Sequence, residues 1–140
     1  LLPDDEGTTA RTLGYRLRDQ HGLDYYVMAT EFYSGAFLAL DACPGNTLQL
    51  VTHQAALPLE DTYAYRFHAE GFPLFMLDLR GVDYAQAEAA WLMGPLLMRR
   101  IGAGYCQAND RDYTRMLSLP TDYDGVIFFD GTSPTTPVGF

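Results

Sequence analysis

Apolar and polar residues occur in blocks along the chain, and residues 74–80 form a central apolar block. Leucine, phenylalanine and methionine dominate it, which is typical of a strand buried on both faces in a sheet covered by helices. Asp78 and Arg80 lie two residues apart near its carboxyl end, so both side chains are expected on one face. Ligands of open α/β sheets bind at that end. We therefore expect a functional site near Arg80, where the two charges form an ion pair, a polar wall of a cleft, or both.

The other blocks predict helices and strands bounded by glycine, proline or polar residues. Helices are expected at residues 9–21, 59–70 and 85–92, and further strands at residues 25–30, 101–105 and 125–129. A β-hairpin is expected from residues 36–41 and 47–53, which flank the turn sequence Cys-Pro-Gly-Asn. Parallel neighbours require crossovers, which the helices can provide. The pattern predicts an α/β fold: a mostly parallel central sheet, containing all four strands, flanked by helices, with an inserted β-hairpin.

Some local patterns add detail to this prediction. The first helix is expected to bury a stripe of small and apolar residues: Ala10, Leu13, Gly14 and Leu17. Residues 107–112 are expected to form a solvated polar loop, and residues 113–117 a helical turn. One arginine of the Arg99-Arg100 pair is expected to reach a buried carboxylate.

Length and composition indicate one folded domain. The chain has 140 residues, of which 48% are hydrophobic, and a chain of this length buries about 68% of its unfolded surface. Its formal net charge of −9 makes nucleic acid and anionic membrane surfaces poor partners. No apolar run approaches the ~20 residues of a membrane span. All nine basic residues are arginine, which excludes a lysine nucleophile.

The cysteines and histidines give no catalytic or metal-binding pattern. Cys43 and Cys106 are far apart and in no metal or redox spacing, so we expect two unpaired thiols and a cytoplasmic location. A catalytic cysteine would need a histidine partner in space. His21, His53 and His68 are scattered, and no pair has metal-ligand spacing. We expect no metal and no other cofactor.

Seven short motifs follow one another between residues 14 and 128, within a stretch from about residue 8 to residue 136. They are Gly-Tyr-Arg-Leu-Arg at 14–18, Asp-Tyr-Tyr-Val-Met-Ala at 24–29, Gly-Ala-Phe at 35–37, Leu-Asp-Leu-Arg at 77–80, Trp-Leu at 91–92, Arg-Ile-Gly-Ala-Gly-Tyr at 100–105 and Tyr-Asp-Gly-Val-Ile-Phe at 123–128. No single motif is specific, but their order and spacing resemble the C-terminal part of the erythromycin esterase family.

The resemblance implies an α/β hydrolase of carboxylic esters or macrolide lactones that acts through base-activated water. In the family, the histidine base and its acidic and arginine partners lie in the N-terminal part, at positions that this chain does not include. We therefore assign no catalytic residue. Residues 1–140 are expected to form a single α/β domain, the C-terminal half of a larger hydrolase domain. Its partners would be the missing N-terminal half and a small-molecule ester or macrolide substrate, and the isolated chain would be inactive.

The candidate substrate-binding residues are Glu31, Phe32, Tyr33 and Arg80. The family often has a Thr-Phe pair where this chain has Glu31-Phe32. A carboxylate directly after a buried strand cannot stay ionised in the core without a partner, so Glu31 is expected on a loop that faces a cleft, solvent or an arginine. Parallel strands would place Glu31 and Arg80 on one rim beside the main pocket, with Phe32 or Tyr33 beside them. The alternative is a solvated acid with no role.

A second class of function stays open. The chain could be a non-catalytic ligand-binding or structural domain that keeps the same scaffold. A haem- or iron-handling role is a third option, and it would need an exposed histidine or tyrosine facing a planar pocket. Two histidines directly upstream of Leu1 in the complete gene would favour the hydrolase, and their absence would favour the binding domain.

Overall fold

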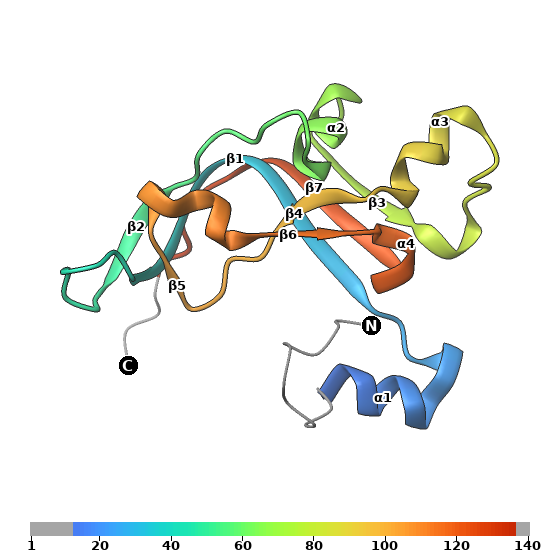
Figure 1. Cartoon of the computed structure of the whole chain (residues 1–140), viewed down its shortest axis with the longest axis horizontal. Helices are drawn as coiled ribbons and strands as arrows, with labels where there is room; N and C mark the ends of the chain where they lie inside the picture. Colours follow the sequence, from blue (N-terminus) through green and yellow to red (C-terminus); the bar gives the residue numbers. More distant parts are fainter. Residues whose placement is uncertain (1–12, 137–140) are drawn as a thin grey trace. The chain divides into compact units, whose positions relative to one another are not determined.

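The computed structural model describes residues 13–136, in which short helices alternate with strands (Figure 1). The α-helices are α1 (Leu13–His21), α2 (Tyr63–Ala69), α3 (Ala87–Ala90) and α4 (Leu119–Asp122). The strands are β1 (Met28–Asp41), β2 (Leu50–Gln54), β3 (Leu74–Asp78), β4 (Leu96–Arg99), β5 (Gly104–Tyr105), β6 (Thr114–Leu117) and β7 (Gly125–Thr132). Four 3₁₀ helices complete this part of the chain: η1 (Gly22–Asp24), η2 (Leu79–Gly81), η3 (Trp91–Met93) and η4 (Gln107–Tyr113). None of the helices in these residues is long and apolar enough to cross a membrane.

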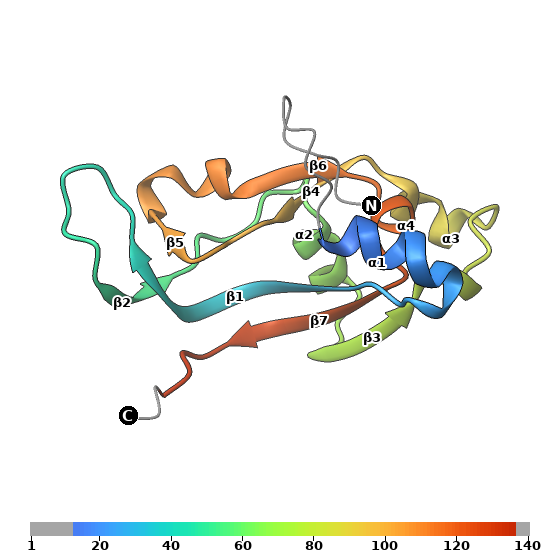
Figure 2. The same cartoon turned by 90° about the horizontal axis from the view of Figure 1, so that it is seen from below.

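Five strands form one sheet of order β2-β1-β7-β3, with β5 paired to β1. The sheet contains all four strands that the sequence placed together, which confirms that prediction and the α/β class. Its directions are mixed, so the mostly parallel arrangement is wrong. β1 pairs antiparallel with β2 and parallel with β5, which Figure 2 shows beside it. β3 runs antiparallel to β7, because the N–H of Asp130 donates to Pro73 and that of Leu79 to Asp124. Strands joined by a turn can pair antiparallel without any crossover helix, as β1 and β2 do.

β1 continues through residues 31–35, which the sequence assigned to a loop. Gly35 lets the strand bend without ending, because its φ is +117°, a value that favours glycine. A Cβ at this position would lie 2.2 Å from the backbone oxygen of Thr132, so only glycine allows this close approach to β7. The predicted hairpin is confirmed in its pairing, from Ala36 opposite Gln54 to Leu40 opposite Leu50. Its first strand, however, is the end of β1.

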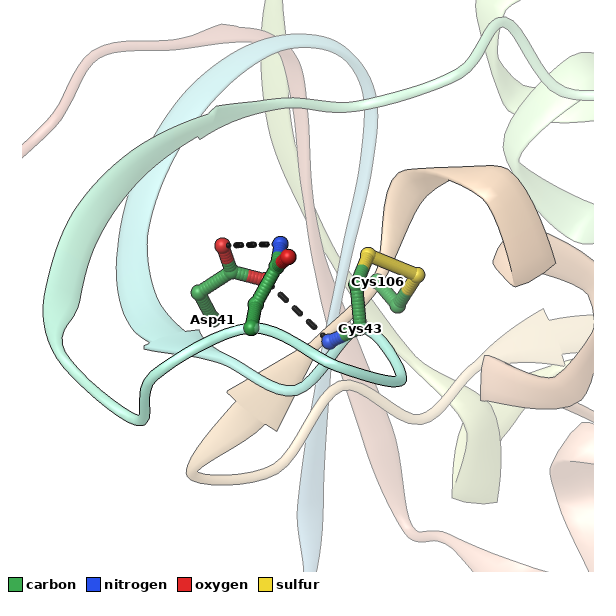
Figure 3. The surroundings of a disulfide bond; sticks show 4 residues. Asp41, Cys43 and Cys106 are labelled. Atoms are coloured by element: carbon green, nitrogen blue, oxygen red, sulfur yellow. Dashed lines mark hydrogen bonds between the residues drawn. A yellow bond between two sulfur atoms is a disulfide. The ribbon is translucent and has the colours of Figure 1, made fainter.

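Cys43 and Cys106 form a disulfide, with their Cα atoms 4.7 Å apart (Figure 3). The expectation of two unpaired thiols is therefore wrong. The parallel register of β1 and β5 brings the cysteines together, since Asp41 lies opposite Tyr105 and the N–H of Ala42 donates to Tyr105 O at 3.1 Å. Oδ1 of Asp41 also accepts the N–H of Cys43 at 3.1 Å, which orders the turn. A sequence separation of 63 residues gives no sign of this pairing.

The chain forms two compact units. Among the described residues, the first unit comprises 13–29, Met76–Pro95 and Leu117–Ile127, and the second comprises Thr30–Phe75, Leu96–Met116 and 128–136. The second unit has an aromatic core, in which the ring centroid of Phe75 lies 5.3 Å from that of Phe67 and 5.2 Å from that of Phe128. Thr62 caps α2 in this unit, because its side chain accepts the N–H of Tyr65 at 3.1 Å.

Asp124 is the centre of a charged network in the first unit. Its Oδ1 accepts a hydrogen bond from Arg80 Nε at 2.9 Å, and its Oδ2 accepts the N–H of Val27 at 2.7 Å and a guanidinium N–H of Arg18. Burial opposes ionisation, but the hydrogen bonds from Arg80, Val27 and Arg18 outweigh it and lower the pKa of Asp124 to about 2. Arg80 thus pairs with Asp124 and not with Asp78, which accepts the backbone N–H of Arg80 at 3.1 Å.

The structure overturns further local expectations. β3 is not buried on both faces, because Leu74 and Met76 are 58% and 65% exposed on a strand at the end of the sheet order. α1 contains no buried residue and Leu13 is exposed, so its predicted buried stripe is absent from the part of α1 that the structure describes; Ala10 lies outside that part. Residues 114–117 form β6, which pairs with β4, instead of a helical turn. Apolar content alone did not specify which faces are covered.

Candidate functional site

A cavity of about 510 Å³ lies within the second unit. Ligand pockets have volumes of about 300–1,000 Å³, so this one can hold a small molecule. Leu57 and Leu59, in the segment between β2 and α2, are 66% and 53% exposed and give the cavity an apolar rim. Its polar lining includes Glu31, 1% exposed, and Arg99, whose side chain is 7% exposed. An apolar rim with a few buried polar groups is typical of a binding site.

Glu31 is a buried carboxyl group inside β1, and it is held by backbone donors. Its Oε1 accepts the N–H of Phe32 at 2.9 Å, and its Oε2 accepts the N–H of Arg99 at 3.0 Å. Among residues 13–136, no side chain donates a hydrogen bond to it. Burial raises the pKa of Glu31 to about 7, although these two hydrogen bonds and the charge of Arg99 act in the opposite direction. Glu31 therefore changes its protonation state near neutral pH.

Arg99 is fixed beside Glu31 at the end of β4. Its Nη1 donates to Oδ1 of Asp110 at 3.0 Å, and its Nη2 donates to the carbonyl oxygen of Ala56. The ring of Phe32 covers the guanidinium, with Cζ of Arg99 5.1 Å from the ring centroid. Asp110 also accepts the hydroxyl of Tyr105 at 2.5 Å. Nε of Arg99 is buried and has no hydrogen-bond partner among residues 13–136.

Sequence reasoning noted these residues without making them site candidates. Arg99 does reach a buried carboxyl group, as expected of one member of the Arg99-Arg100 pair, but it does so through its backbone N–H. Its side chain pairs with Asp110. Residues 107–112, expected as a solvated loop, form most of η4 and line the cavity. Within residues 13–136, no group of three or more His, Cys, Asp and Glu side chains could hold a metal ion.

The predicted site residues fall in different surroundings. Glu31 lines the cavity, and Phe32 packs on Arg99 behind it. Tyr33 stacks on His68, with ring centroids 3.7 Å apart, and so lies in another contact of the second unit. Arg80 belongs to the first unit, where it pairs with Asp124 and donates to the carbonyl oxygens of Leu23 and Tyr25. Their shared role as substrate contacts stays a prediction.

We expect the protonation of Glu31 to make the stability of the protein depend on pH. The carboxyl group has an ordinary pKa of 4.5 and a pKa of about 7 in the fold. Between these values the folded chain binds more protons than the unfolded chain, so the free energy of unfolding falls as pH rises. A shift of this size corresponds to at most about 3 kcal/mol. Urea denaturation between about pH 5 and pH 8 measures this fall.

Glu31→Gln removes the titrating group and should reduce the fall in the free energy of unfolding over that range. The amide has one acceptor oxygen for two backbone donors, so the variant is also expected to be less stable at low pH. Glu70→Gln, at an exposed position of the same unit, is the matched control and should keep the wild-type pH dependence. Equal pH dependence in Glu31→Gln and wild type would show that folding does not change the pKa of Glu31.

A mixed sheet, short helices and a cavity lined in part by strand β1 define an α/β protein with a cavity of ligand size. The model of the erythromycin esterase family matches residues 4–132. The chain therefore belongs to the erythromycin esterase family. No curated protein matches it.

Two solved structures show the same fold over part of their length. One is a protein from Bacillus cereus, with 18% sequence identity and a TM-score of 0.71, where the alignment covers 86% of this chain and 28% of that chain. The other is a succinoglycan biosynthesis protein, with 16% identity and a TM-score of 0.71, where it covers 88% of this chain and 28% of that chain. At these identities the likeness shows the fold alone. The chain spans 28% of the length of these proteins.

Proposed function

We propose that this chain is the substrate-binding part of a carboxylic ester hydrolase, with an ester or macrolide lactone as substrate. The observation that carries the proposal is the family match over residues 4–132, and the cavity with its apolar rim supports it. A histidine outside these residues would act as general base and remove a proton from water, which then attacks the ester carbonyl carbon. The residues of this chain would hold and orient the substrate and exclude competing water.

The candidate substrate contacts remain Glu31, Phe32, Tyr33 and Arg80, and support for them is unequal. Glu31 is best supported, because it lines the cavity and changes protonation near neutral pH. Phe32 would act on a substrate indirectly, because its ring covers the guanidinium of Arg99, a residue that lines the cavity. Tyr33 and Arg80 make other contacts in this structure, with His68 and Asp124, so a substrate role would require those contacts to be shared.

We also propose that the remainder of the family domain is the partner of this chain. The solved structures of similar fold continue well beyond the matched part, which is 28% of their length. The outward side chains of β3, Leu74 and Met76, are apolar and more than half exposed. Apolar side chains on an end strand of a sheet commonly mark a surface that another segment covers.

Ester hydrolysis by the protein expressed from its complete gene tests the proposal. We expect it to hydrolyse a simple chromogenic ester or a macrolide, and we expect the folded 140-residue chain to be inactive, because the general base lies outside it. Glu31→Gln should raise KM about fivefold or more with little change in kcat, since it alters binding and not the base. The control Glu70→Gln should leave both constants unchanged.

The proposal has two distinct ways to fail. Hydrolysis by the 140-residue chain alone, abolished by changing one of its own residues, would place the catalytic group inside it. Binding of esters without turnover by the complete gene product would identify a non-catalytic ligand-binding domain on the same scaffold.

A further inference from the structure

The first turn of η4 forms part of the cavity wall and is held by few bonds. Gln107, Ala108 and Asn109 line the cavity, and all three are exposed to solvent. The turn ends at Asn109, where the backbone leaves the helical conformation with φ −119° and ψ 34°. Its own hydrogen bond joins the N–H of Asn109 to the carbonyl oxygen of Cys106 at 3.0 Å. Hydrogen bonds in 3₁₀ turns have poorer geometry than those in α-helices, so residues 106–109 depend on what anchors them.

The residues on either side of this turn are fixed, but the turn itself is joined to the rest of the chain by the disulfide. Tyr105, before it, is fully buried, and Asp110, after it, accepts the hydroxyl of Tyr105 at 2.5 Å. Within the described part of the chain, no hydrogen bond or ion pair links residues 106–109 to another segment. The bond from Cys106 to Cys43 is the link that does so.

The turn that carries Cys43 is ordered without the disulfide. Oδ1 of Asp41 accepts the N–H of Cys43 at 3.1 Å (Figure 3), and Oδ2 accepts the side-chain amide of Asn46 at 2.8 Å. β1 and β2 pair with each other on either side of this turn. Breaking the disulfide would therefore leave Cys43 in place and release the cavity side of the bond.

A thiol reagent can approach the bond from the side of Cys43. This residue is half-buried between two exposed neighbours, Ala42 and Pro44, whereas Cys106 is 2% exposed. A dithiol gives two electrons and two protons to the bond, which breaks into two thiols, and the dithiol closes to its own disulfide. The reaction is balanced with the dithiol as the only other reactant.

We propose that the Cys43–Cys106 bond is a redox switch for the cavity: its reduction by a dithiol frees residues 106–109 and weakens ligand binding. In the oxidised chain this part of the wall is held in place before a ligand arrives. In the reduced chain, binding has to order it first, and the lost conformational entropy lowers the affinity. The inference rests on the proposed function only in taking the cavity as the ligand site.

Binding of benzylacetone to the oxidised and the reduced chain tests the inference. This ketone has an apolar body for the leucine rim and no bond that an esterase can hydrolyse. We expect dithiothreitol, a dithiol, to raise its dissociation constant about fivefold, the lower end of typical coupling between two sites. NMR titration of both forms measures the two dissociation constants.

Linkage requires an equal effect in the opposite direction. Saturating benzylacetone should raise, by the same factor of about five, the ratio of reduced to oxidised dithiothreitol at which half of the protein is reduced. Alkylation of free thiols followed by mass spectrometry measures that ratio. A ligand that bound both redox states equally would leave it unchanged.

Backbone nitrogen relaxation shows whether the released segment is local. On reduction, the order parameters of residues 107–109 should fall below about 0.6, while those of α2 stay near about 0.85. The Cys43→Ser, Cys106→Ser double variant should bind benzylacetone as weakly as reduced wild type and should not respond to dithiothreitol. Should the variant fail to fold, reoxidation of reduced wild type gives the same comparison, because it should restore the tighter binding.

Three results would overturn the inference. Equal dissociation constants in the two redox states would show that the disulfide does not control the cavity. Loss of order in α2 together with residues 107–109 would show that the bond holds the whole fold. Failure of benzylacetone to bind the oxidised chain would show that the cavity takes no apolar ligand of this size.

These results are separate from a failure of the proposed function, because none of them depends on turnover. Redox-dependent binding in a protein whose complete gene product hydrolyses no ester would support the switch and remove the hydrolase. Ester hydrolysis by the complete gene product, with the same benzylacetone affinity in both redox states, would support the hydrolase and remove the switch.

Discussion

Replacing both Cys43 and Cys106 with serine should lower the free energy of unfolding by about 4 kcal/mol. The disulfide joins residues 63 positions apart, and closing a loop of that length removes much of the conformational entropy of the unfolded chain. The native contacts around it are already formed, since β1 and β5 pair directly beside the cysteines. The main effect of the double change therefore falls on the unfolded state, which gains freedom.

Urea denaturation of oxidised and reduced protein measures this effect and supplies its own control. Wild type treated with dithiothreitol should match the double serine variant, and dithiothreitol should leave the variant unchanged. Because η4 begins directly after Cys106 and lines the cavity, the variant should also exchange the amide hydrogens of η4 faster. A double variant as stable as oxidised wild type would show that the disulfide does not restrict the unfolded chain.

The disulfide also bears on the environment of the protein. Disulfides persist in oxidising compartments and are rare in the cytosol, where thiols are kept reduced. The cytoplasmic location expected from the sequence rested on reading both cysteines as unpaired thiols, and that interpretation was wrong. We therefore expect the protein to show its full stability only where the Cys43–Cys106 bond is kept oxidised.

Local patterns predicted the elements of the fold better than their faces and directions. Residues 74–79 and 125–129 appear as β3 and β7, and α2 ends before Gly71 as its sequence indicated. Strand direction depends on which segments meet in the sheet, and the apolar pattern carries no such information. The same limit explains why Leu74 is exposed: its exposure depends on what covers that face and not on its own side chain.

The candidate site was predictable only in part, because the sequence indicates single candidate residues but does not show which residues meet in the fold. Glu31 was identified because a carboxylate directly after a buried strand was expected to face a cleft, solvent or an arginine. The structure instead buries it inside β1, where burial raises its pKa. Arg99 and Asp110 lie far from Glu31 in sequence, and folding alone joins them to it. Gly35 was assigned to a loop, because a glycine that bends a continuous strand and one that ends it look alike in sequence.

Asp124→Asn should lower the free energy of unfolding by about 3 kcal/mol at neutral pH, because one side chain organises much of the first unit. Its carboxylate is 12% exposed and accepts hydrogen bonds from Arg18, Arg80 and the backbone N–H of Val27. An asparagine removes the charge that balances two guanidinium groups and turns an N–H₂ group toward one of them. Removing one partner of a largely buried ion pair costs about 3–5 kcal/mol, and the partial exposure of Arg80 places this case at the lower end.

The pH dependence of that loss identifies its cause. Since the pKa of Asp124 is lowered to about 2, its contribution is present above the ordinary value of 3.8 and is lost as pH falls through about 2. The difference between wild type and Asp124→Asn, measured by urea denaturation, should therefore be largest at neutral pH and shrink in acid. Asp19→Asn, at an exposed position of α1 in the same unit, is the control and should change stability by less than about 0.5 kcal/mol. A loss that stays constant down to the lowest pH would mean that Asp124 acts through packing, and that its charge does not hold Arg18 and Arg80 in place.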